Sequence, residues 1–348
     1  MTTYLITGGC GFIGSNFILR LLSNQPQARV INLDKLTYAG NPANLREVEH
    51  DEGYRFVKGD ICNVALVDEL VQQADVIVNF AAESHVDRSL MEADSFIHTD
   101  VYGTHILLDA ARRNPGLKRF LHISTDEVYG DVAEGKSSLE TDPLRPRSPY
   151  SASKAGGEMQ CLAYIETYGL PVVIARAANN VGPRQHIEKF VPLFTTNALD
   201  DEPLPLYGDG RQMRDWLYVE DNCEALELLL QEGEPGQVYN IGAGNHRCNI
   251  EVAERIVDLL EKPRSLIRFV ADRAGHDHRY SVNFDRMRKL GWSPRHGFEE
   301  AIEKTVQWYV DNRGWWEAVR AGQFQEYYQQ QYGRRLAEAR PYSGGKGQ

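Results

Sequence analysis

A glycine-rich turn near the N-terminus constrains the fold of this chain more than any other feature. Residues 7–14, Thr-Gly-Gly-Cys-Gly-Phe-Ile-Gly, lie between an apolar segment, Tyr4–Thr7, and a helical pattern over Ile13–Ser23. Glycines at such positions allow a tight turn, a close approach of backbone N–H groups to phosphates, and close packing of helix on strand. The helix N-terminus adds a partial positive charge. The order strand, turn, helix therefore predicts a dinucleotide-binding fold with Gly8, Gly11 and Gly14 in its phosphate loop.

An acidic residue stands where this fold places its ribose ligand. Asp34 ends the next apolar segment, Arg29–Leu33, 20 residues after Gly14. A carboxylate there accepts hydrogen bonds from the ribose hydroxyls and repels a 2′-phosphate, which favours NAD over NADP. Lys35 weakens this preference slightly. Asp60 and Ile61 follow the third predicted strand and are expected to border the adenine.

The first half of the chain alternates short apolar runs with helical patterns, which is typical of a parallel sheet with crossover helices. The sequence predicts strands over Tyr4–Thr7, Arg29–Leu33, Tyr54–Lys58, Val76–Phe80, Arg119–Ser124 and Pro171–Ala175. It predicts helices over Ile13–Ser23, Val64–Gln72, Ser95–Arg112, Ser151–Tyr168, Asn249–Glu261 and Phe298–Asn312. From about residue 181 proline and glycine become frequent and the alternation lapses. We expect an α/β protein with a Rossmann-like doubly wound parallel sheet.

Composition excludes several classes of protein. The 38 Lys and Arg residues against 49 Asp and Glu residues leave a net charge of −11, which argues against nucleic-acid or anionic-membrane binding. Apolar runs stay shorter than the ~18 residues of a transmembrane helix, and the N-terminus lacks a signal-peptide layout. Five cysteines without a CxxC pair argue against a disulfide framework or a zinc site. We expect a soluble cytoplasmic protein with a disordered polar tail at Ser343–Gln348.

Two motifs in the middle of the chain predict the reactive centre. Tyr150 and Lys154 are four residues apart at the start of a predicted helix, so the ammonium can lie near the phenol. A neighbouring cation stabilises phenolate and lowers the pKa of a tyrosine from about 10 toward the working pH. Thr125, Asp126 and Glu127 directly follow the fifth strand, where ligands bind in parallel α/β sheets. A hydroxyl and two carboxyls there provide an acid and a base.

These motifs, Gly-x-x-Gly-x-x-Gly, Tyr-x-x-x-Lys and Ser-Thr-Asp-Glu-Val-Tyr-Gly, resemble those of the extended short-chain dehydrogenase/reductase family. Within it, the sequence is most similar to nucleotide-sugar 4,6-dehydratases of the dTDP-glucose type. The resemblance runs from residue 4 to about 333 and includes the stretches 34–41, 81–89, 207–221 and 272–277.

The resemblance implies a reaction on a nucleoside-diphosphate hexose with internally recycled NAD. Tyr150, helped by Lys154 and Thr125, would take the sugar O4 proton while NAD accepts hydride from C4. Glu127 would then remove the C5 proton, and Asp126 would protonate the departing C6 hydroxyl. Return of the hydride to C6 gives a 4-keto-6-deoxy sugar, so the enzyme would be a hydro-lyase.

The family's binding contacts transfer to matching positions. Cofactor contacts implied in this way, besides the glycines, are Phe12, Ile13, Asp34, Lys35, Leu36, Thr37, Asp60, Ile61, Ala81, Ala82, Thr99, Tyr150, Lys154 and Asn180. Implied substrate contacts are Ser84, Asn179, Lys189, Phe190, Pro205, Tyr207, Arg214, Asn249, Arg273 and His276. Arg214 and Arg273 suit a diphosphate, and Tyr207 offers a stacking surface for a pyrimidine. His276-Asp-His278 with Asp272 has metal-ligand spacing, but the resemblance places His276 at the substrate, and we expect no metal.

The resemblance also implies the domain organisation. Residues 1–180 with 216–242 are expected to form the NAD-binding domain, which includes a late strand at Val238–Ile241. Residues 181–215 with 243–348 are expected to form a smaller, discontinuous α/β nucleotide-sugar-binding domain. A homodimer would join through the helices around 95–112 and 150–168.

Departures from the family pattern leave the substrate open. Ala177 and Ala178 replace Cys-Ser, Val181, Arg184, His186 and Ile187 replace bulkier or more rigid residues, and Asp100 stands where Asn is usual. The donor sugar could therefore carry UDP or another nucleotide in place of dTDP. The alternatives are an NDP-sugar 4-epimerase or decarboxylase, whose segment after the fifth strand lacks the Asp-Glu pair. A non-catalytic NAD sensor is the alternative outside enzymes, although such proteins commonly lose the Tyr or Lys.

Overall fold

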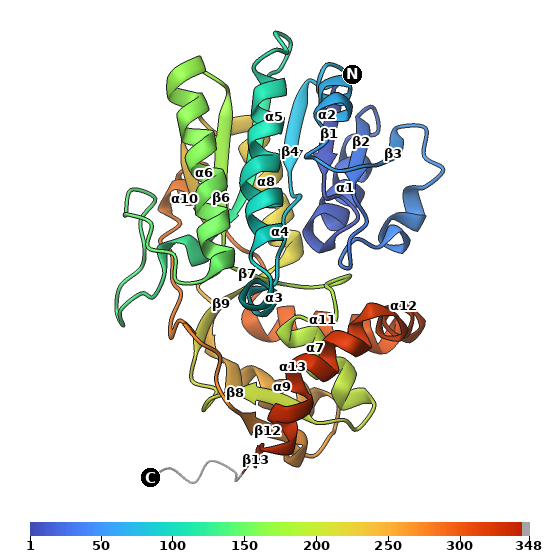
Figure 1. Cartoon of the computed structure of the whole chain (residues 1–348), viewed down its shortest axis with the longest axis vertical. Helices are drawn as coiled ribbons and strands as arrows, with labels where there is room; N and C mark the ends of the chain where they lie inside the picture. Colours follow the sequence, from blue (N-terminus) through green and yellow to red (C-terminus); the bar gives the residue numbers. More distant parts are fainter. Residues whose placement is uncertain (343–348) are drawn as a thin grey trace.

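A seven-stranded parallel sheet forms the larger part of the molecule (Figure 1). The computed structural model describes residues 1–342. The strand order is β10-β6-β5-β4-β1-β2-β3. These strands are β1 (Thr3–Thr7), β2 (Arg29–Asp34), β3 (Tyr54–Lys58), β4 (Val76–Asn79), β5 (Arg119–Thr125), β6 (Val172–Ala177) and β10 (Val238–Ile241). The order reverses between β1 and β4, and such a switch point opens a ligand crevice at the carboxyl ends of the strands. The doubly wound sheet predicted from the sequence is confirmed, with strand ends shifted by one or two residues.

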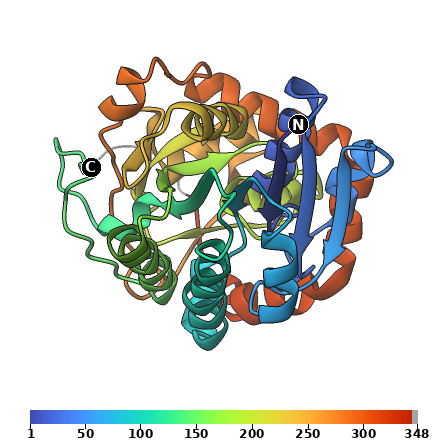
Figure 2. The same cartoon turned by 90° about the horizontal axis from the view of Figure 1, so that it is seen from above.

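Helices cover both faces of this sheet. Helices α1 (Phe12–Asn24) and α8 (Val219–Glu232) pack on one face, in a core that includes Phe17 and Leu226. Helices α2 (Val64–Val71), α5 (Thr104–Ala111) and α6 (Pro149–Tyr168) pack on the other. Figure 2 shows α5 and α6 side by side on one side of the sheet and α8 on the other. Coverage of both faces explains why the strands are almost uniformly apolar.

The predicted helix over Ser95–Arg112 is not one continuous α-helix. It consists of α4 (Asp94–Phe96), a π-helical segment, η2 (Ile97–Gly103), and α5. A π-helical turn holds an extra residue, which the spacing of apolar residues did not reveal. The segment lies against α6, and its turn places Asp100 among buried residues.

Local sequence determines where α6 begins. Ser148 accepts a 3.0 Å hydrogen bond from the Ser151 backbone, and the Ser151 hydroxyl accepts one of 3.0 Å from the Ser148 backbone. Pro149 at the first helical position completes this capping box. The helix ends at Gly169, whose φ of 66° is the left-handed conformation that glycine adopts readily. Tyr150 therefore lies in the first turn, with Lys154 one turn further along the same helix face.

The later segments build a second lobe below the sheet in Figure 1. It contains two three-stranded sheets, of order β11-β9-β7 and β13-β12-β8. Their strands are β7 (Asn179–Val181), β8 (Leu204–Tyr207), β9 (Met213–Tyr218), β11 (His246–Cys248), β12 (Ile267–Val270) and β13 (Arg340–Pro341). The main helices are α7 (Phe190–Leu199), α9 (Asn249–Leu259), α11 (Phe298–Asp311), α12 (Arg313–Val319) and α13 (Gln325–Ala337), with a π-helical segment, η5 (Arg320–Phe324), between the last two.

The remaining elements are short and connect these layers. They are η1 (Pro42–Val48), α3 (Val86–Met91), η3 (Asp126–Tyr129), η4 (Arg264–Leu266) and α10 (Asp285–Lys289). The second lobe has its own apolar core, which includes Phe194, Ile256 and Trp316. The domain limits given above stay a prediction, and the tail at Ser343–Gln348 lies outside the described residues. In the part of the chain that the structure describes, no helix combines the length and the apolar character needed to cross a membrane.

Candidate active site

A cavity of about 300 Å³ lies at the carboxyl ends of β1, β2, β4 and β5. A side chain at Gly8, where φ is 69°, would bring its Cβ to 2.7 Å from the Ala81 nitrogen. A Cβ at Gly14 would lie 2.5 Å from the Gly8 carbonyl oxygen. Only glycine fits at these points, and the exposed backbone of the loop is the cradle that a dinucleotide's pyrophosphate requires. The residues present therefore fit NAD.

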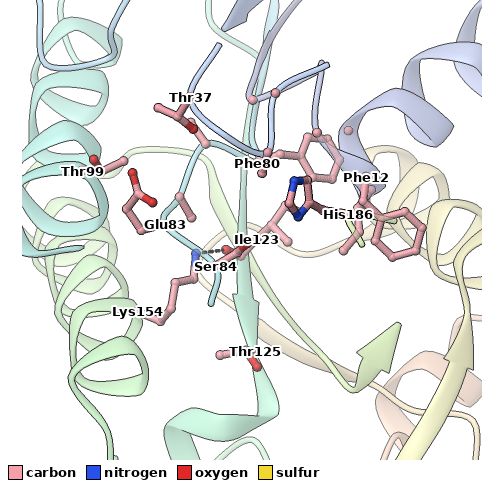
Figure 3. A pocket seen from close by; sticks show the side chains of 18 of the residues that line it. Phe12, Thr37, Phe80, Glu83, Ser84, Thr99, Ile123, Thr125, Lys154 and His186 are labelled. Carbon is pink, nitrogen blue, oxygen red and sulfur yellow. Dashed lines mark hydrogen bonds between the residues drawn. The ribbon is translucent and has the colours of Figure 1, made fainter. Parts of the chain in front are cut away.

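Sixteen of the seventeen residues expected to contact the cofactor line this cavity. They are Gly8, Gly11, Phe12, Ile13, Gly14, Asp34, Lys35, Thr37, Asp60, Ile61, Ala81, Ala82, Thr99, Tyr150, Lys154 and Asn180. Figure 3 shows Phe12, Thr37 and Thr99 on different sides of the cavity. Leu36 is the exception, because it packs against the core beside α1.

Asp34 has a structural task in addition to facing the cavity. Its carboxylate accepts one 2.8 Å hydrogen bond from the Cys10 backbone and another of 2.8 Å from the Leu36 backbone. Burial raises the pKa of Asp34, and these two hydrogen bonds oppose the rise. Lys35 is engaged elsewhere, since its Nζ lies 2.7 Å from Asp60 Oδ2. Lys35, the cation that weakened the preference for NAD over NADP, is therefore paired with Asp60.

Tyr150 and Lys154 both lie in the cavity wall, but their electrostatics differ from the prediction. Lys154 Nζ donates a 2.6 Å hydrogen bond to the Ile123 carbonyl at the end of β5 (Figure 3). Burial raises the pKa of Tyr150 well above its usual value, and the charge of Glu127 adds to the rise. A hydrogen bond with Thr125 opposes it. The expected lowering of the pKa of Tyr150 is therefore not found for these residues on their own, because burial and the nearby carboxylates raise it.

The two carboxyls after β5 occupy different environments. Asp126 is 2% exposed, and its Oδ1 lies 3.2 Å from the Thr125 hydroxyl. Among residues 1–342, Asp126 Oδ2 has no hydrogen-bond partner. Burial and the neighbouring Glu127 raise the pKa of Asp126 well above its usual range, which favours the protonated form of this carboxyl. Glu127 lines the cofactor cavity and the one beside it, and Tyr280 lies within 3.3 Å of its Oε2.

A second cavity, of about 160 Å³, adjoins the first and opens between the two lobes. All ten residues expected to contact the substrate line it: Ser84, Asn179, Lys189, Phe190, Pro205, Tyr207, Arg214, Asn249, Arg273 and His276. The two cavities share Ser84, Glu127, Asn179 and Lys189. The carboxylate of Glu127 therefore lies where a substrate in the second cavity meets a cofactor in the first.

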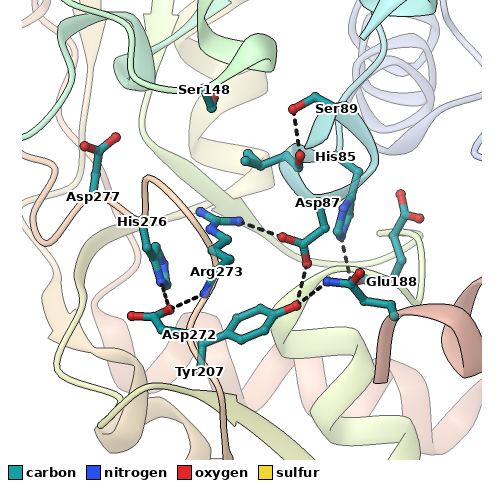
Figure 4. Close-up of polar contacts among 12 residues, drawn as sticks. His85, Asp87, Ser89, Ser148, Glu188, Tyr207, Asp272, Arg273, His276 and Asp277 are labelled. Carbon is teal, nitrogen blue, oxygen red and sulfur yellow. Dashed lines mark hydrogen bonds and ion pairs between the residues drawn. The ribbon is translucent and has the colours of Figure 1, made fainter. Parts of the chain in front are cut away.

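Polar contacts fix the walls of the second cavity (Figure 4). The Tyr207 hydroxyl donates to Asp87 Oδ2 at 2.8 Å, and Arg273 Nη1 donates to Asp87 Oδ1 at 3.2 Å. Arg214 Nη2 donates a 2.9 Å hydrogen bond to the Asp277 carbonyl, and the Arg214 guanidinium lies 4.1 Å from the centre of the Tyr280 ring. Both arginines line the cavity, Arg214 buried and Arg273 partly buried, and two cations there suit the capture of a diphosphate.

His276 belongs to this substrate wall. Its Nδ1 lies 2.6 Å from Asp272 Oδ1, while the backbone carbonyl of His278 accepts from Arg214 at 3.3 Å. Within the described ranges, no group of three or more His, Cys, Asp or Glu side chains is arranged to hold a metal ion.

The departures from the family pattern fall in different places: Asp100 lies in η2 of the larger lobe, and Ala177 and Ala178 line the cofactor cavity. Val181 and Ile187 are buried in the core of the second lobe. Arg184 has φ of 69° and contacts Glu47, while His186 lines the cofactor cavity. These substitutions lie beside the cavities and leave the catalytic residues in place.

Sequence reasoning missed several residues that shape the site. Glu83 lines the cofactor cavity, and Asp87 joins Tyr207 to Arg273. Both lie in the stretch 81–89 that the resemblance had already marked, so their motif was a usable signal. Tyr280, whose hydroxyl donates to Asp277 Oδ2 at 2.7 Å, lies in no recognised motif.

Comparison with known proteins places this geometry in a family. The family described as GDP-mannose 4,6 dehydratase matches residues 5–305. The chain belongs to this family.

Individual relatives agree with that placement. The chain is 52% identical over 306 residues to the low-salt glycan biosynthesis protein Agl12 of Haloferax volcanii, covering 88% of this chain and 98% of that protein. It is 48% identical over 322 residues to a dTDP-glucose 4,6-dehydratase of Streptomyces niveus, covering 91% and 95%. The crystal structure of DesIV, a dTDP-glucose 4,6-dehydratase of Streptomyces venezuelae with NAD and dTDP bound, matches with a TM-score of 0.89 at 48% identity, covering 91% of this chain and 99% of that one.

These comparisons confirm the predicted Rossmann-like fold, NAD as the cofactor, and an NDP-sugar 4,6-dehydratase, which is a hydro-lyase. The roles of individual residues are inferred from the geometry of the site.

Proposed function

We propose that this protein converts dTDP-glucose to its 4-keto-6-deoxy product. The observation that supports this most directly is the Asp126–Glu127 pair at the junction of the two cavities. Asp126 is buried and has a raised pKa, and its neighbour Glu127 faces the substrate space. Elimination of water needs both an acid and a base, and this arrangement provides both.

Oxidation at C4 is the first step. Tyr150 takes the proton of the sugar O4 hydroxyl, with Thr125 hydrogen-bonded to its phenol. Held in the first cavity, NAD would supply the hydride acceptor for C4 and the hydride donor for C6.

Elimination follows from the acidity of the new 4-ketone. Glu127 removes the C5 proton, and Asp126 gives its proton to the C6 hydroxyl, which leaves as water. Once the hydride has returned to C6, Glu127 gives its proton back to C5. The proton that Tyr150 took from O4 passes through solvent to Asp126, which had lost its own to the departing water, so all three groups regain their starting states. Burial favours the protonated form of Asp126 that this step needs.

Residues of the second lobe bind the nucleotide part of the substrate. Arg214 and Arg273 hold the diphosphate, and Tyr207 offers its ring to the pyrimidine. Support for dTDP comes from the relatives named above, two of which are dTDP-glucose 4,6-dehydratases.

The decisive experiment is an assay of the purified protein with dTDP-glucose, UDP-glucose and CDP-glucose without added NAD. Mass spectrometry should show the loss of one water from dTDP-glucose, together with the alkali-induced absorbance of a 4-keto-6-deoxy sugar. If only UDP-glucose loses water, the reaction class would stand and the preferred base would be uracil in place of thymine. A 4-epimer in place of water loss would contradict the proposal, and so would bound NAD without any turnover.

We further propose that two copies pair through the helices around 95–112 and 150–168. Four large apolar side chains there are 42–54% exposed: Ile97, Tyr102, Met159 and Tyr168. Light scattering should give twice the chain mass for the unmodified protein. The double variant Ile97→Glu, Met159→Lys should give the mass of a single chain. The control Val310→Lys, at an exposed position of α11, should leave the mass unchanged. A cytoplasmic location is also proposed, supported by five cysteines that are all free.

A further inference from the structure

Asp100 is a buried carboxyl that the reaction scheme above does not use. It lies in the π-helical segment η2 and is 2% exposed. Helix α6 packs directly on this segment, because a Cβ at Gly157 would lie 2.7 Å from the Asp100 carbonyl oxygen. A Cβ at Gly156 would similarly meet Val101 at 2.8 Å. The glycine pair thus brings Asp100 against the helix that holds the phenol and the ammonium of the active site.

The hydrogen bonds of Asp100 accommodate both of its protonation states. Its Oδ1 accepts from the Glu83 backbone at 2.9 Å, and its Oδ2 lies 2.6 Å from the Ser153 hydroxyl. The same hydroxyl lies 2.8 Å from the Tyr150 carbonyl oxygen. Ser153 has one proton, so it donates to Asp100 when that group is ionised. When Asp100 is protonated, it donates to Ser153, which then donates to the Tyr150 carbonyl.

Charged and titratable groups face Asp100 from three sides. Lys154 and Tyr150 come from α6, Glu83 from the segment after β4, and His122 from β5, close to the Gly157 that packs on Asp100. Burial raises the pKa of Asp100 to about 6; Lys154 and the hydrogen bonds from Ser153 and the Glu83 backbone oppose the rise, and the charge of the Glu83 side chain adds to it. In return, burial lowers the pKa of Lys154, and Asp100 is the main group opposing that fall. The charge of Asp100 also raises the pKa of Tyr150.

We propose that Asp100 is a positioning residue for C4 oxidation, whose negative charge keeps Lys154 protonated and sets the pH range in which the Tyr150–Lys154 pair works. The proposal rests on the proposed function for the step that is measured. Asp100 touches neither cavity and acts only through the residues of α6. Removal of its charge should lower the pKa of both Lys154 and Tyr150, since a negative charge favours the protonated form of each.

The test is the pH profile of the first turnover of the NAD-bound protein with dTDP-glucose, followed as the absorbance of reduced cofactor. Asp100→Asn keeps the size of the side chain and the acceptor for the Glu83 amide. Both limbs of its profile should move to lower pH by about one unit. If Asp100→Asn does not fold, Asp100→Ser carries the same expectation.

Two control variants separate charge from structure. Asp109→Asn removes a carboxylate from the neighbouring α5, where it pairs with Arg112 on the surface, and should leave both limbs in place. Ser153→Ala removes the hydrogen bond but not the charge, so its alkaline limb should stay where it is in the unmodified protein. A lower rate with unmoved limbs in Asp100→Asn would overturn the proposal. No C4 oxidation by the unmodified protein would instead overturn the proposed function.

Discussion

Trp315 of α12 donates a 2.9 Å hydrogen bond from its indole nitrogen to Asn44 Oδ1 in η1. The amide nitrogen of Asn44 donates in turn to the Cys10 carbonyl, also at 2.9 Å. A helix of the second lobe therefore supports the phosphate loop from behind, two hydrogen bonds away from the pyrophosphate site.

Trp315→Phe should weaken NAD binding by about fivefold, because it removes one hydrogen bond worth about 1 kcal/mol from that support. Calorimetric titration of NAD into protein stripped of the cofactor measures this. Trp308→Phe is the matched control, since Trp308 packs on Trp315 with ring centres 5.0 Å apart. Equal losses in both variants would show that packing matters and the hydrogen bond to Asn44 does not.

The double variant Asp126→Asn, Glu127→Gln should retain C4 oxidation and lose water elimination by at least about a hundredfold, because both proton-transfer groups become amides. Mass spectrometry of the product and the absorbance of reduced cofactor separate the two steps. Normal formation of the 4-keto-6-deoxy sugar by this variant would refute the assigned roles.

Tyr150→Phe should abolish C4 oxidation itself, because no other phenol on α6 faces the cofactor cavity in the described structure. Tyr164→Phe is the control on the same helix, where the hydroxyl lies 3.2 Å from His105 Nδ1. It should oxidise C4 at the unmodified rate. Hydride transfer from C4 in Tyr150→Phe at that rate would remove Tyr150 as the base.

His186 should make the protein sensitive to acid. Burial lowers its pKa from 6.5 to about 4, so the folded state favours the neutral imidazole. The stability that follows is complete above pH 6.5 and is lost as pH falls toward 4, up to about 3 kcal/mol. His186→Phe should flatten the fall of the unfolding free energy across this range in urea titrations. His50→Gln, at an exposed position, should keep the slope of the unmodified protein.

Arg176 and Glu158 form a buried ion pair under the Asp126 turn, with Nη2 and Oε2 2.6 Å apart. Arg176→Met should cost about 3–5 kcal/mol of unfolding free energy, because it leaves the Glu158 carboxylate buried without its cation. The double variant Arg176→Met, Glu158→Leu should be more stable than Arg176→Met alone. Urea midpoints measure all three, and a double variant less stable than the single one would show that the pair's other contacts dominate.

Sequence reasoning succeeded where a local motif determines geometry. The capping box at Ser148 and Ser151 fixes where α6 begins, so the Tyr150–Lys154 spacing translated directly into positions on one helix face. The glycine loop did the same for the cofactor cavity, since steric contacts exclude any side chain at Gly8 and Gly14.

Other features depend on contacts between distant segments, and the sequence did not reveal them. Burial is the largest influence on the pKa of Tyr150, followed by the charge of Glu127. Leu36 matched a cofactor motif but packs, partly buried, against the core, and its backbone has φ of 55° beside Asp34. The π-helical turn at Asp100 and the support of Asn44 by Trp315 likewise arise only once the chain has folded.

The two cavities have only four lining residues in common, and this has a consequence for how such enzymes can diversify. The residues to which we assign the hydride and proton chemistry all precede residue 190, whereas most of the lining of the second cavity comes from later segments. Mutations in those later segments can exchange one activated sugar for another without disturbing the reaction. A library of variants restricted to these later segments would therefore test new sugar donors while every member kept the same catalytic residues.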